Sequence, residues 1–263
     1  MGAQGSRSRP AAPRASGQHL LRSDQLAREL VGQACVRAGD VVLEIGAGRG
    51  RLTDALARAE ARVIAVELDP VFAESLRQRF RSRARVTIVE ADALQAALPD
   101  EPFRAFGNIP FGLTTAILRR LLDDPTSPLL GADLIVQYET ARKRASVWPS
   151  TLASLGWSPW WDFHLARRLP AAAFEPPPSV DAALLSITRR GEPLLPAGQR
   201  EEYLTLVRAA FRQAGLPVQR SLRGRIPERA WKRTARDRGI RPGAKSSDLD
   251  VFDWVALFSL AVK

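Results

Sequence analysis

The sequence has few of the residues that form disulfides and metal sites. Its 263 residues include one cysteine, Cys35, and two histidines, His19 and His164. One cysteine excludes an internal disulfide and a cysteine-rich zinc site, and two histidines are too few for a histidine-rich metal site. Cys35 falls in an apolar helical pattern, where a packed thiol is expected. We therefore expect no metal cofactor.

Long apolar runs are also missing. No stretch reaches the length that spans a membrane, and the N-terminus lacks the hydrophobic core of a signal peptide, so we expect a cytoplasmic protein with no membrane partner. Acidic residues are outnumbered, because 39 Lys and Arg face 28 Asp and Glu and leave a net charge of +11. Such a charge favours a polyanionic partner, above all nucleic acid, although an arginine-rich composition can also serve solubility alone.

The chain divides into three parts by pattern. Residues 1–17 are basic and of low complexity, which predicts a disordered tail. Residues 18–188 alternate strand and helix patterns, which predicts an α/β catalytic domain with a parallel, doubly wound sheet. Strand patterns stop after that, and residues 189–263 are expected to form a small all-helical, RNA-binding domain with helices at 201–213, 227–238 and 249–262.

Local signals also place the ends of helices in the α/β part. Ser23 is a plausible N-cap for a helix that runs to Cys35, and Pro70 can open the helix after the second strand. Thr114 or Thr115 is expected to cap a later helix.

The stretch from Val41 to Gly50, VVLEIGAGRG, combines a buried strand, a glycine-rich turn and the start of a helix. A dinucleotide site requires GxGxxG, but the third glycine falls one place early and Arg51 occupies the required position. A glutamate in the strand followed by GxGxG is typical of methyltransferases that use S-adenosylmethionine. The sequence therefore predicts this cofactor on a Rossmann-like sheet. A tight turn in another kind of α/β protein is the alternative.

Four polar or glycine residues follow the ends of different predicted strands. Gly46, Glu67, Asp92 and Asn108 come directly after or at the end of these strands, which are expected at 41–45, 62–67, 86–90 and 103–106, with further strands at 133–137 and 182–187. Ligands of parallel sheets bind beyond the carboxyl ends of strands. We expect Glu67 to accept the ribose hydroxyls of the cofactor and Asp92 its adenine amine. The alternative for both acids is capping of the next helix.

The most specific motif is Asn108-Ile109-Pro110-Phe111. The lone pair of an exocyclic amine on a base is delocalised into the ring, so carbonyl groups that accept its hydrogens can help to aim it at a methyl donor. We expect Asn108 Oδ1 and the Pro110 carbonyl to accept these hydrogens, and Phe111 to stack on the target base. Phe174 is a candidate second stacking face, with a core role as the alternative. An ordinary Asn-Pro turn is the alternative for the motif.

Basic clusters predict the RNA contacts. Nine basic and two acidic residues lie between Arg220 and Arg241, and a further basic loop is expected at 142–144. A solvated helix face is the alternative to phosphate contact. Four tryptophans occur in residues 148–161, of which two are expected to pack in the interior. The expected RNA-binding residues are Arg142, Lys143, Arg144, Arg220, Arg223, Arg225 and Arg229.

Together the motifs resemble a known family. Residues 17–21 (GQHLL), 44–50 (EIGAGRG), 108–111 (NIPF), 137–139 (QYE) and 174–181 (FEPPPSVD), with Glu67 and Asp92, occur in the order and at the spacing of the ribosomal RNA adenine N6-methyltransferases, or dimethyladenosine transferases. The match is strongest to the erythromycin-resistance (Erm) branch. The resemblance implies a donor site lined by His19, Leu21, Gly46, Gly48, Glu67, Asp92 and Asn108.

The same resemblance implies the substrate. It is one adenosine in domain V of 23S rRNA, whose N6-methylation gives resistance to macrolide, lincosamide and streptogramin B antibiotics. We expect a monomer. Family members generally have Asn where this chain has His19, so binding of the donor is expected to persist with a possible pH dependence.

Three other functions stay open from the sequence. One is the branch that dimethylates adenines of 16S rRNA, and another is a DNA adenine methyltransferase, although that class uses an Asn-Pro-Pro-Tyr motif and a separate recognition domain. The third is a non-catalytic RNA-binding protein with this fold. The sequence does not distinguish monomethylation from dimethylation, or naked rRNA from an assembly intermediate.

Overall fold

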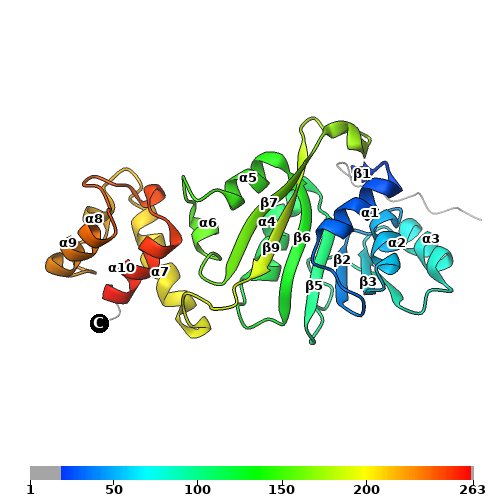
Figure 1. The fold of residues 1–263 in the computed structure, drawn as a ribbon, viewed down its shortest axis with the longest axis horizontal. Helices are drawn as coiled ribbons and strands as arrows, with labels where there is room; N and C mark the ends of the chain where they lie inside the picture. The colour runs from blue at the N-terminus through cyan, green and yellow to red at the C-terminus, as the bar shows by residue number, and fades with distance from the viewer. Residues whose placement is uncertain (1–18, 262–263) are drawn as a thin grey trace, which may run out of the picture.

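A computed structural model describes residues 19–261 of the chain. They form a large α/β lobe and a smaller helical lobe that lies at one end of it (Figure 1). The predicted tail at 1–17 and the first two residues of the GQHLL motif lie outside the described residues.

A seven-stranded sheet forms the centre of the large lobe. Its order is β4-β3-β2-β5-β6-β9-β7, and among the described strands of this sheet β9 alone runs opposite to the others. The expected Rossmann-like sheet is confirmed. The strands are β2 (Val41–Ile45), β3 (Arg62–Glu67), β4 (Val86–Glu90), β5 (Phe103–Asn108), β6 (Leu129–Gln137), β7 (Trp161–Leu169) and β9 (Ala182–Arg189).

The sheet differs from the expected parallel, doubly wound sheet in two respects. The last expected strand, β9, is reversed, and β7 was not expected at all. β7 lies at the edge of the sheet and is buried only at its two ends, between which partly buried and exposed residues alternate, so its outward side chains include Arg and His. An edge strand of this kind lacks the continuous apolar run by which the central strands are recognised.

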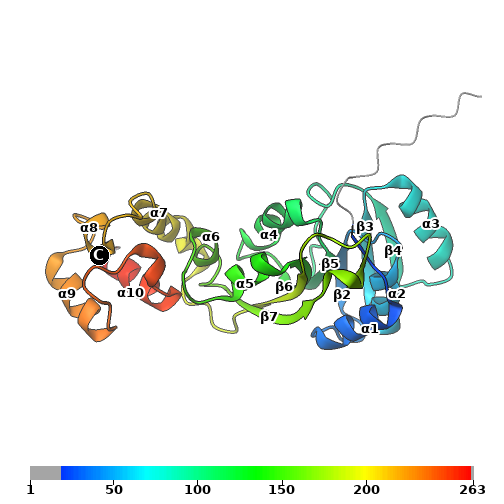
Figure 2. The ribbon, with the colours of Figure 1, turned by 90° about the horizontal axis from the view of Figure 1, so that it is seen from above.

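Helices cover both faces of the sheet. Figure 2 shows α1 (Asp24–Gln33) and α4 (Thr114–Leu122) on opposite sides. Apolar residues of α1, α2 (Arg51–Arg58) and α3 (Pro70–Phe80) pack into one cluster with one set of strand residues. Residues of α4, α5 (Tyr138–Ala145) and α6 (Leu152–Leu155) pack into the cluster on the other face. Both faces of the central strands are therefore excluded from water, which is why β2 is buried at every residue.

Two of the expected helix starts are confirmed and one is wrong. The Ser23 hydroxyl oxygen accepts the Leu26 N–H at 3.2 Å, and Pro70 is the first residue of α3 behind the N-cap Asp69. A 3-10 turn at Phe111–Leu113 precedes α4, so Thr114 is already helical and its hydroxyl donates to the Phe111 carbonyl instead of capping the helix.

The strand register brings the expected site residues to one edge of the sheet. Ile45 pairs with both Val66 and Gly107, and Glu67 pairs with Glu90. The residues that follow these positions, including Asp92 and Asn108, therefore leave the sheet at the same edge, as the sequence predicted.

A second, two-stranded sheet was not expected. β1 (Leu20–Leu21) pairs antiparallel with β8 (Phe174–Glu175). This pairing brings the N-terminal motif against the proline-rich loop that precedes β9. Two residues per strand are too short to produce a recognisable pattern in the sequence.

The helical lobe consists of α7 (Arg200–Phe211), α8 (Val218–Ser221), α9 (Glu228–Asp237) and α10 (Val251–Ala261), with 3-10 turns at Ala197–Gln199 and Ser246–Asp248. It shares an apolar core with the large lobe. Trp160 of the large lobe donates a hydrogen bond to the Leu195 carbonyl, and its ring meets the Tyr203 ring edge-on with 6.3 Å between the ring centroids. The three expected helices are present, and α8 was missed because it has a single turn.

Candidate active site

The glycine turn after β2 takes a conformation that favours glycine. Gly46 has a φ of 74° and Gly48 a φ of 54°, in the left-handed region where a side chain is strained. The N–H groups of Gly46 and Ala47 both donate to the Val66 carbonyl, at 2.9 and 3.2 Å. A Cβ added to Gly48 would lie 2.8 Å from Leu20 Cδ2. The turn is therefore fixed to β3 on one side and lies against β1 on the other.

Glu67 holds this turn through its carboxylate. One oxygen accepts the Gly48 N–H at 2.7 Å, and the other accepts the Asp69 N–H at 2.9 Å. The residue is 2% exposed. Each carboxylate oxygen can accept a second hydrogen bond, so these two bonds leave acceptor capacity for ribose hydroxyls.

Glu44 lies beneath the turn and is completely buried. One of its oxygens accepts the Thr53 hydroxyl at 2.6 Å, whereas Oε1 has no hydrogen-bond partner among the described residues. Burial raises the pKa of Glu44 to about 7, against the hydrogen bond from Thr53, and the nearby Glu67 raises it further. A buried oxygen without a partner is costly, which indicates a place for a donor group that the protein itself does not provide.

Asn108 is held in one orientation at the end of β5. Its Nδ2 donates to the backbone carbonyl of His19 at 2.6 Å. A carbonyl can only accept, so the NH₂ side of the amide must face His19 and Oδ1 must face away from it. The Pro110 carbonyl accepts the Leu113 N–H at 2.8 Å and keeps a second lone pair.

The His19 ring connects the same motif to the proline-rich loop. Nδ1 lies 2.8 Å from the Pro176 carbonyl, and therefore carries a hydrogen and donates it. The ring centroid of His19 lies 5.9 Å from that of Phe111. Three segments that are distant in sequence thus meet around Asn108, and we call these contacts of His19 with Asn108 and Pro176 the clasp.

Two adjoining hollows lie around the Gly46 turn and Asn108. Both are lined by Leu20, Gly46 and Asn108. One continues along Leu21 and Arg49, and the other along His19, Gly48, Ile109, Pro110 and Phe111. The expected residues at the methionine end, the glycine turn and the reacting amide are therefore brought together.

Leu20 was not predicted as a site residue. It was missed because the two-residue strand alternates: Leu21 is 5% exposed and belongs to the core, whereas Leu20 lies over Gly48. Leu68 is a second missed candidate. It is 62% exposed directly after Glu67, and an exposed leucine beside a buried acid is a signal that the sequence alone does not show.

Two expected residues have other contacts. Asp92 caps the turn after β4, where Oδ1 accepts the Leu94 N–H at 2.8 Å, and neither hollow includes it. Its expected contact with adenine stays a prediction. Phe174 is 1% exposed and packs in the core cluster under β1, so it offers no free face to a base. The expectation that Phe174 stacks on the target is corrected to the core role, because β8 pairing turns the ring inward.

The comparisons with known proteins point to one family. The family model described as ribosomal RNA adenine dimethylase matches residues 12–263. The chain belongs to this family. An rRNA adenine N-6-methyltransferase of Corynebacterium diphtheriae is 39% identical over 207 residues, covering 79% of this chain and 80% of that one. The mycinamicin-resistance protein MyrB of Micromonospora griseorubida is 36% identical over 259 residues, covering 94% and 80%. The crystal structure of the 23S rRNA methyltransferase ErmE has a TM-score of 0.83 at 32% identity and covers 93% of this chain and all of that one.

The expected resemblance to the adenine N6-methyltransferases and their Erm branch is thus confirmed. Within residues 19–261, this family member has no helix long and apolar enough to cross a membrane. The same residues contain no cluster of His, Cys, Asp and Glu that suits a metal ion.

The basic residues expected to contact RNA fall into two groups. Arg142, Lys143 and Arg144 lie in the helix α5, not in a loop. Arg142 and Lys143 are exposed, and Arg142 pairs with Glu139 at 2.8 Å. Arg144 points inward, where it donates to Thr151 and lies over Trp157, and burial lowers its pKa. Arg144 is thus partly buried, with its contacts inside the large lobe, and its expected contact with RNA stays a prediction.

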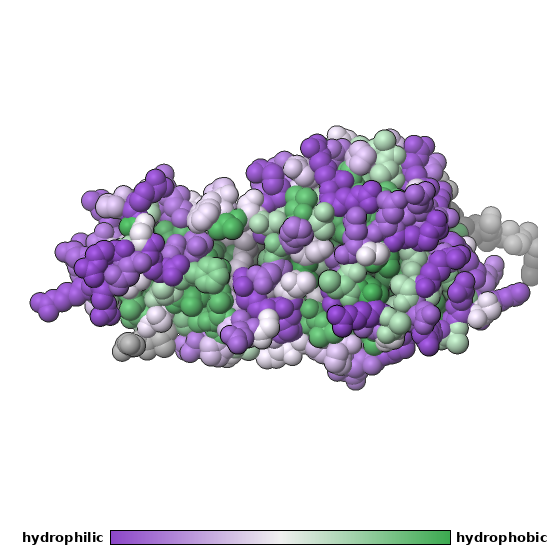
Figure 3. Space-filling view, in the orientation of Figure 1, coloured by the Kyte–Doolittle hydropathy of each residue, from purple (hydrophilic) through white to green (hydrophobic). Residues whose placement is uncertain are grey.

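The second group lies in the helical lobe. All four expected arginines there are exposed, and none forms an ion pair within the described part of the chain: Arg220, Arg223, Arg225 and Arg229. Figure 3 shows hydrophilic side chains over the outer end of this lobe, where α9 lies. Trp231 is the buried residue of α9. The residues of α9 that face solvent include its basic side chains.

Proposed function

We propose that this chain uses S-adenosylmethionine to methylate N6 of one adenosine in domain V of 23S rRNA. The modification gives resistance to macrolide, lincosamide and streptogramin B antibiotics. The proposal depends most on the orientation of Asn108. Its Nδ2 donates a hydrogen bond to the His19 carbonyl, which leaves Oδ1 available as an acceptor next to the glycine turn. The similarity to MyrB and ErmE over most of the chain supports the choice of substrate.

The residues around the turn fit S-adenosylmethionine. Gly46 and Gly48 allow a close approach, Glu67 keeps acceptor capacity for the ribose, and Glu44 has a buried oxygen without a partner. We assign Asp92 to the adenine amine and the exposed Leu68 to the adenine face. His19 and Leu21 lie toward the methionine end, with His19 Nε2 as the ring atom that the clasp leaves available.

The bound cofactor supplies a methyl group on a sulfonium. Asn108 Oδ1 and the Pro110 carbonyl accept the two hydrogens of the adenine amine and orient its lone pair toward that methyl. Phe111 provides the face on which the base stacks after it is turned out of its helix or loop. No base needs to act before attack, because the cationic product amine loses its proton readily. The protein thus contributes positioning and hydrogen-bond acceptors.

RNA binding is assigned to exposed basic residues on both lobes. Arg142 and Lys143 lie on α5, which begins where β6 leaves the sheet beside Asn108. Arg220, Arg223, Arg225 and Arg229 extend the basic surface over the helical lobe. We propose that the protein works as a monomer in the cytoplasm, without a metal or a membrane partner.

Transfer of a labelled methyl group to purified 23S and 16S rRNA, followed by mapping of the modified base, tests the proposal. We expect label in domain V of 23S rRNA only. Label in 16S rRNA would instead support the small-subunit branch of the family. Asn108→Ala should abolish transfer while rRNA affinity stays near that of the wild type. Full activity of this variant would refute the acceptor mechanism, and RNA binding without transfer by the wild type would favour a non-catalytic role.

A further inference from the structure

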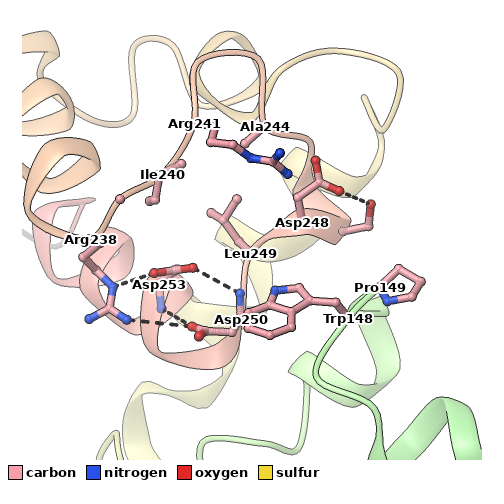
Figure 4. Close-up of a pocket in the computed structure, with 12 residues that line it drawn as sticks. Trp148, Pro149, Arg238, Ile240, Arg241, Ala244, Asp248, Leu249, Asp250 and Asp253 are labelled. Carbon is pink, nitrogen blue, oxygen red and sulfur yellow. Dashed lines mark hydrogen bonds and ion pairs between the residues drawn. The ribbon is translucent and has the colours of Figure 1, made fainter.

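A further hollow lies away from the candidate active site. It has a volume of about 560 Å³ and separates the loop after α5 from the helical lobe (Figure 4). Trp148 and Pro149 line it from the large lobe. The helical lobe contributes Arg238, Ile240, Arg241, Asp248 and Leu249. No expected site residue lines this hollow.

Hydrogen bonds fix the two sides of the hollow relative to one another. The Ser150 N–H donates to the Ser247 carbonyl at 2.8 Å, which ties the loop after α5 to the turn at Ser246–Asp248. On the opposite wall, Arg238 lies 2.5 Å from Asp253 and 3.9 Å from Asp250. The hollow is therefore preformed, and Arg238 compensates one of the two negative charges of these acids.

Trp148 differs from the other tryptophans of its segment. Trp157, Trp160 and Trp161 are buried, whereas Trp148 is 59% exposed. Figure 4 shows its indole extending from the loop after α5 toward Leu249 and Asp250 of the helical lobe. A large aromatic ring left in water beside a fixed cavity is more typical of a binding surface than of a core.

Polar groups of both signs complete the lining. Arg241 is exposed and forms no ion pair within residues 19–261. The Asp248 carboxylate at the rim accepts the Lys245 N–H at 3.0 Å on one oxygen and the Ser247 hydroxyl at 3.4 Å on the other, and each oxygen can accept one more hydrogen bond. An indole face, a free guanidinium and a carboxylate acceptor match the base, phosphate and amino group of a nucleotide.

We infer that this hollow binds one unpaired nucleotide of the RNA substrate, outside the target adenosine. The base stacks on Trp148, its phosphate pairs with Arg241, and an exocyclic amine donates to Asp248, which favours adenine, cytosine or guanine over uracil. The volume lies in the range of small-ligand sites, roughly 300–1,000 Å³. The inference rests on the proposed function, because it takes rRNA as the substrate.

The position of the hollow suits an RNA that also reaches the active site. α5 begins at the end of β6, whose Ile135 pairs with Asn108, and it leads directly toward Trp148. The helix has eight residues and is therefore about 12 Å long. To reach both places, a single-stranded stretch that flanks the target adenosine has to span the length of α5 and the residues that join its ends to Ile135 and Trp148.

Trp148→Ala tests the inference, with methylation kinetics on a domain V RNA fragment. Loss of one stacked base is expected to raise KM for RNA roughly 5-fold to 100-fold, with kcat and donor affinity unchanged. Trp148→Phe keeps a stacking face and should recover most of the affinity. Val147→Ala is the matched control, because Val147 is an exposed neighbour that does not line the hollow. Thermal melting checks that each variant is folded.

Chemical probing of the bound RNA gives a readout that does not depend on methyl transfer. We expect one unpaired nucleotide outside the target to be protected by the wild type and by Val147→Ala, and to become reactive with Trp148→Ala or Arg241→Gln. Unchanged KM and unchanged protection in Trp148→Ala would overturn the inference while leaving the proposed function intact. If protection of the RNA depends on Trp148 but the wild type transfers no methyl group, the inferred nucleotide site is supported and the proposed function is refuted.

Discussion

Replacing Asn108 by Asp separates two properties of this amide, its hydrogen bond to His19 and its proposed role as an acceptor for the target amine. The exchange is nearly isosteric and keeps an oxygen for the target amine. It removes the N–H that the His19 carbonyl accepts at 2.6 Å, and it places a second acceptor against that carbonyl. If Asn108 acts only as an acceptor, Asn108→Asp should retain activity. If the clasp sets its orientation, the variant should lose activity although the acceptor is present.

The size of the loss follows from the unmatched pair of acceptors. Leaving a partly buried acceptor without its donor costs about 1–3 kcal/mol, which corresponds to roughly 5-fold to 150-fold in kcat/KM. Protonation of the introduced carboxyl restores a donor toward His19 while its other oxygen still faces the substrate. The facing carbonyl raises the pKa of that carboxyl, because it disfavours the charged form. The activity of Asn108→Asp should therefore rise as the pH falls.

The assay measures kcat/KM of the variant and of the wild type on a domain V fragment between about pH 5.5 and about pH 8.5, a range of about three pH units around neutrality. The quantity compared is the ratio of the two values at each pH. The ratio removes any pH dependence that the two proteins share. Asn108→Ala is the control, since it cannot titrate and its ratio should stay low and flat. A flat, high ratio for Asn108→Asp would show that the clasp does not orient the amide.

Three further predictions follow from the burial and charge of other residues. Burial raises the pKa of Glu44 to about 7, so the folded state favours its neutral form and stability is lost as the pH rises from about 4.5 to 7. Glu44→Gln should remove about 2.5 kcal/mol of this loss, measured as the change in unfolding free energy between pH 5 and pH 8. Phe174 occupies a core position, so Phe174→Leu should lower the melting temperature while kcat changes less than about threefold. A large loss of kcat in a variant with an unchanged melting temperature would instead support stacking of Phe174 on the target base. Arg223→Ala and Arg229→Ala should each reduce the slope of log K for RNA binding against log salt concentration by about 1, measured by filter binding. Unchanged slopes would show that these two arginines do not contact RNA phosphates.

The sequence was most informative where physical patterns are strong. The strand at 62–67 and the strand ends that carry Glu67 and Asn108 were predictable because central parallel strands are apolar and ligands bind at their carboxyl ends. β7 and the β1–β8 pair were not, because one is an edge strand and the other is two residues long. The inward turn of Phe174 and Arg144 depends on tertiary packing, which local patterns do not reveal.

The clasp also means that the candidate active site is assembled only when distant parts of the chain come together. Its hydrogen bonds join residues 89 and 157 positions apart, and no single contiguous fragment of the large sheet contains all the parts. A shortened protein that starts after Leu21 would keep every strand of that sheet and still leave Asn108 free to rotate. Fusion partners placed at the amino terminus face the same constraint: they must allow a two-residue strand to dock, or they yield a well-folded protein without an organised catalytic amide.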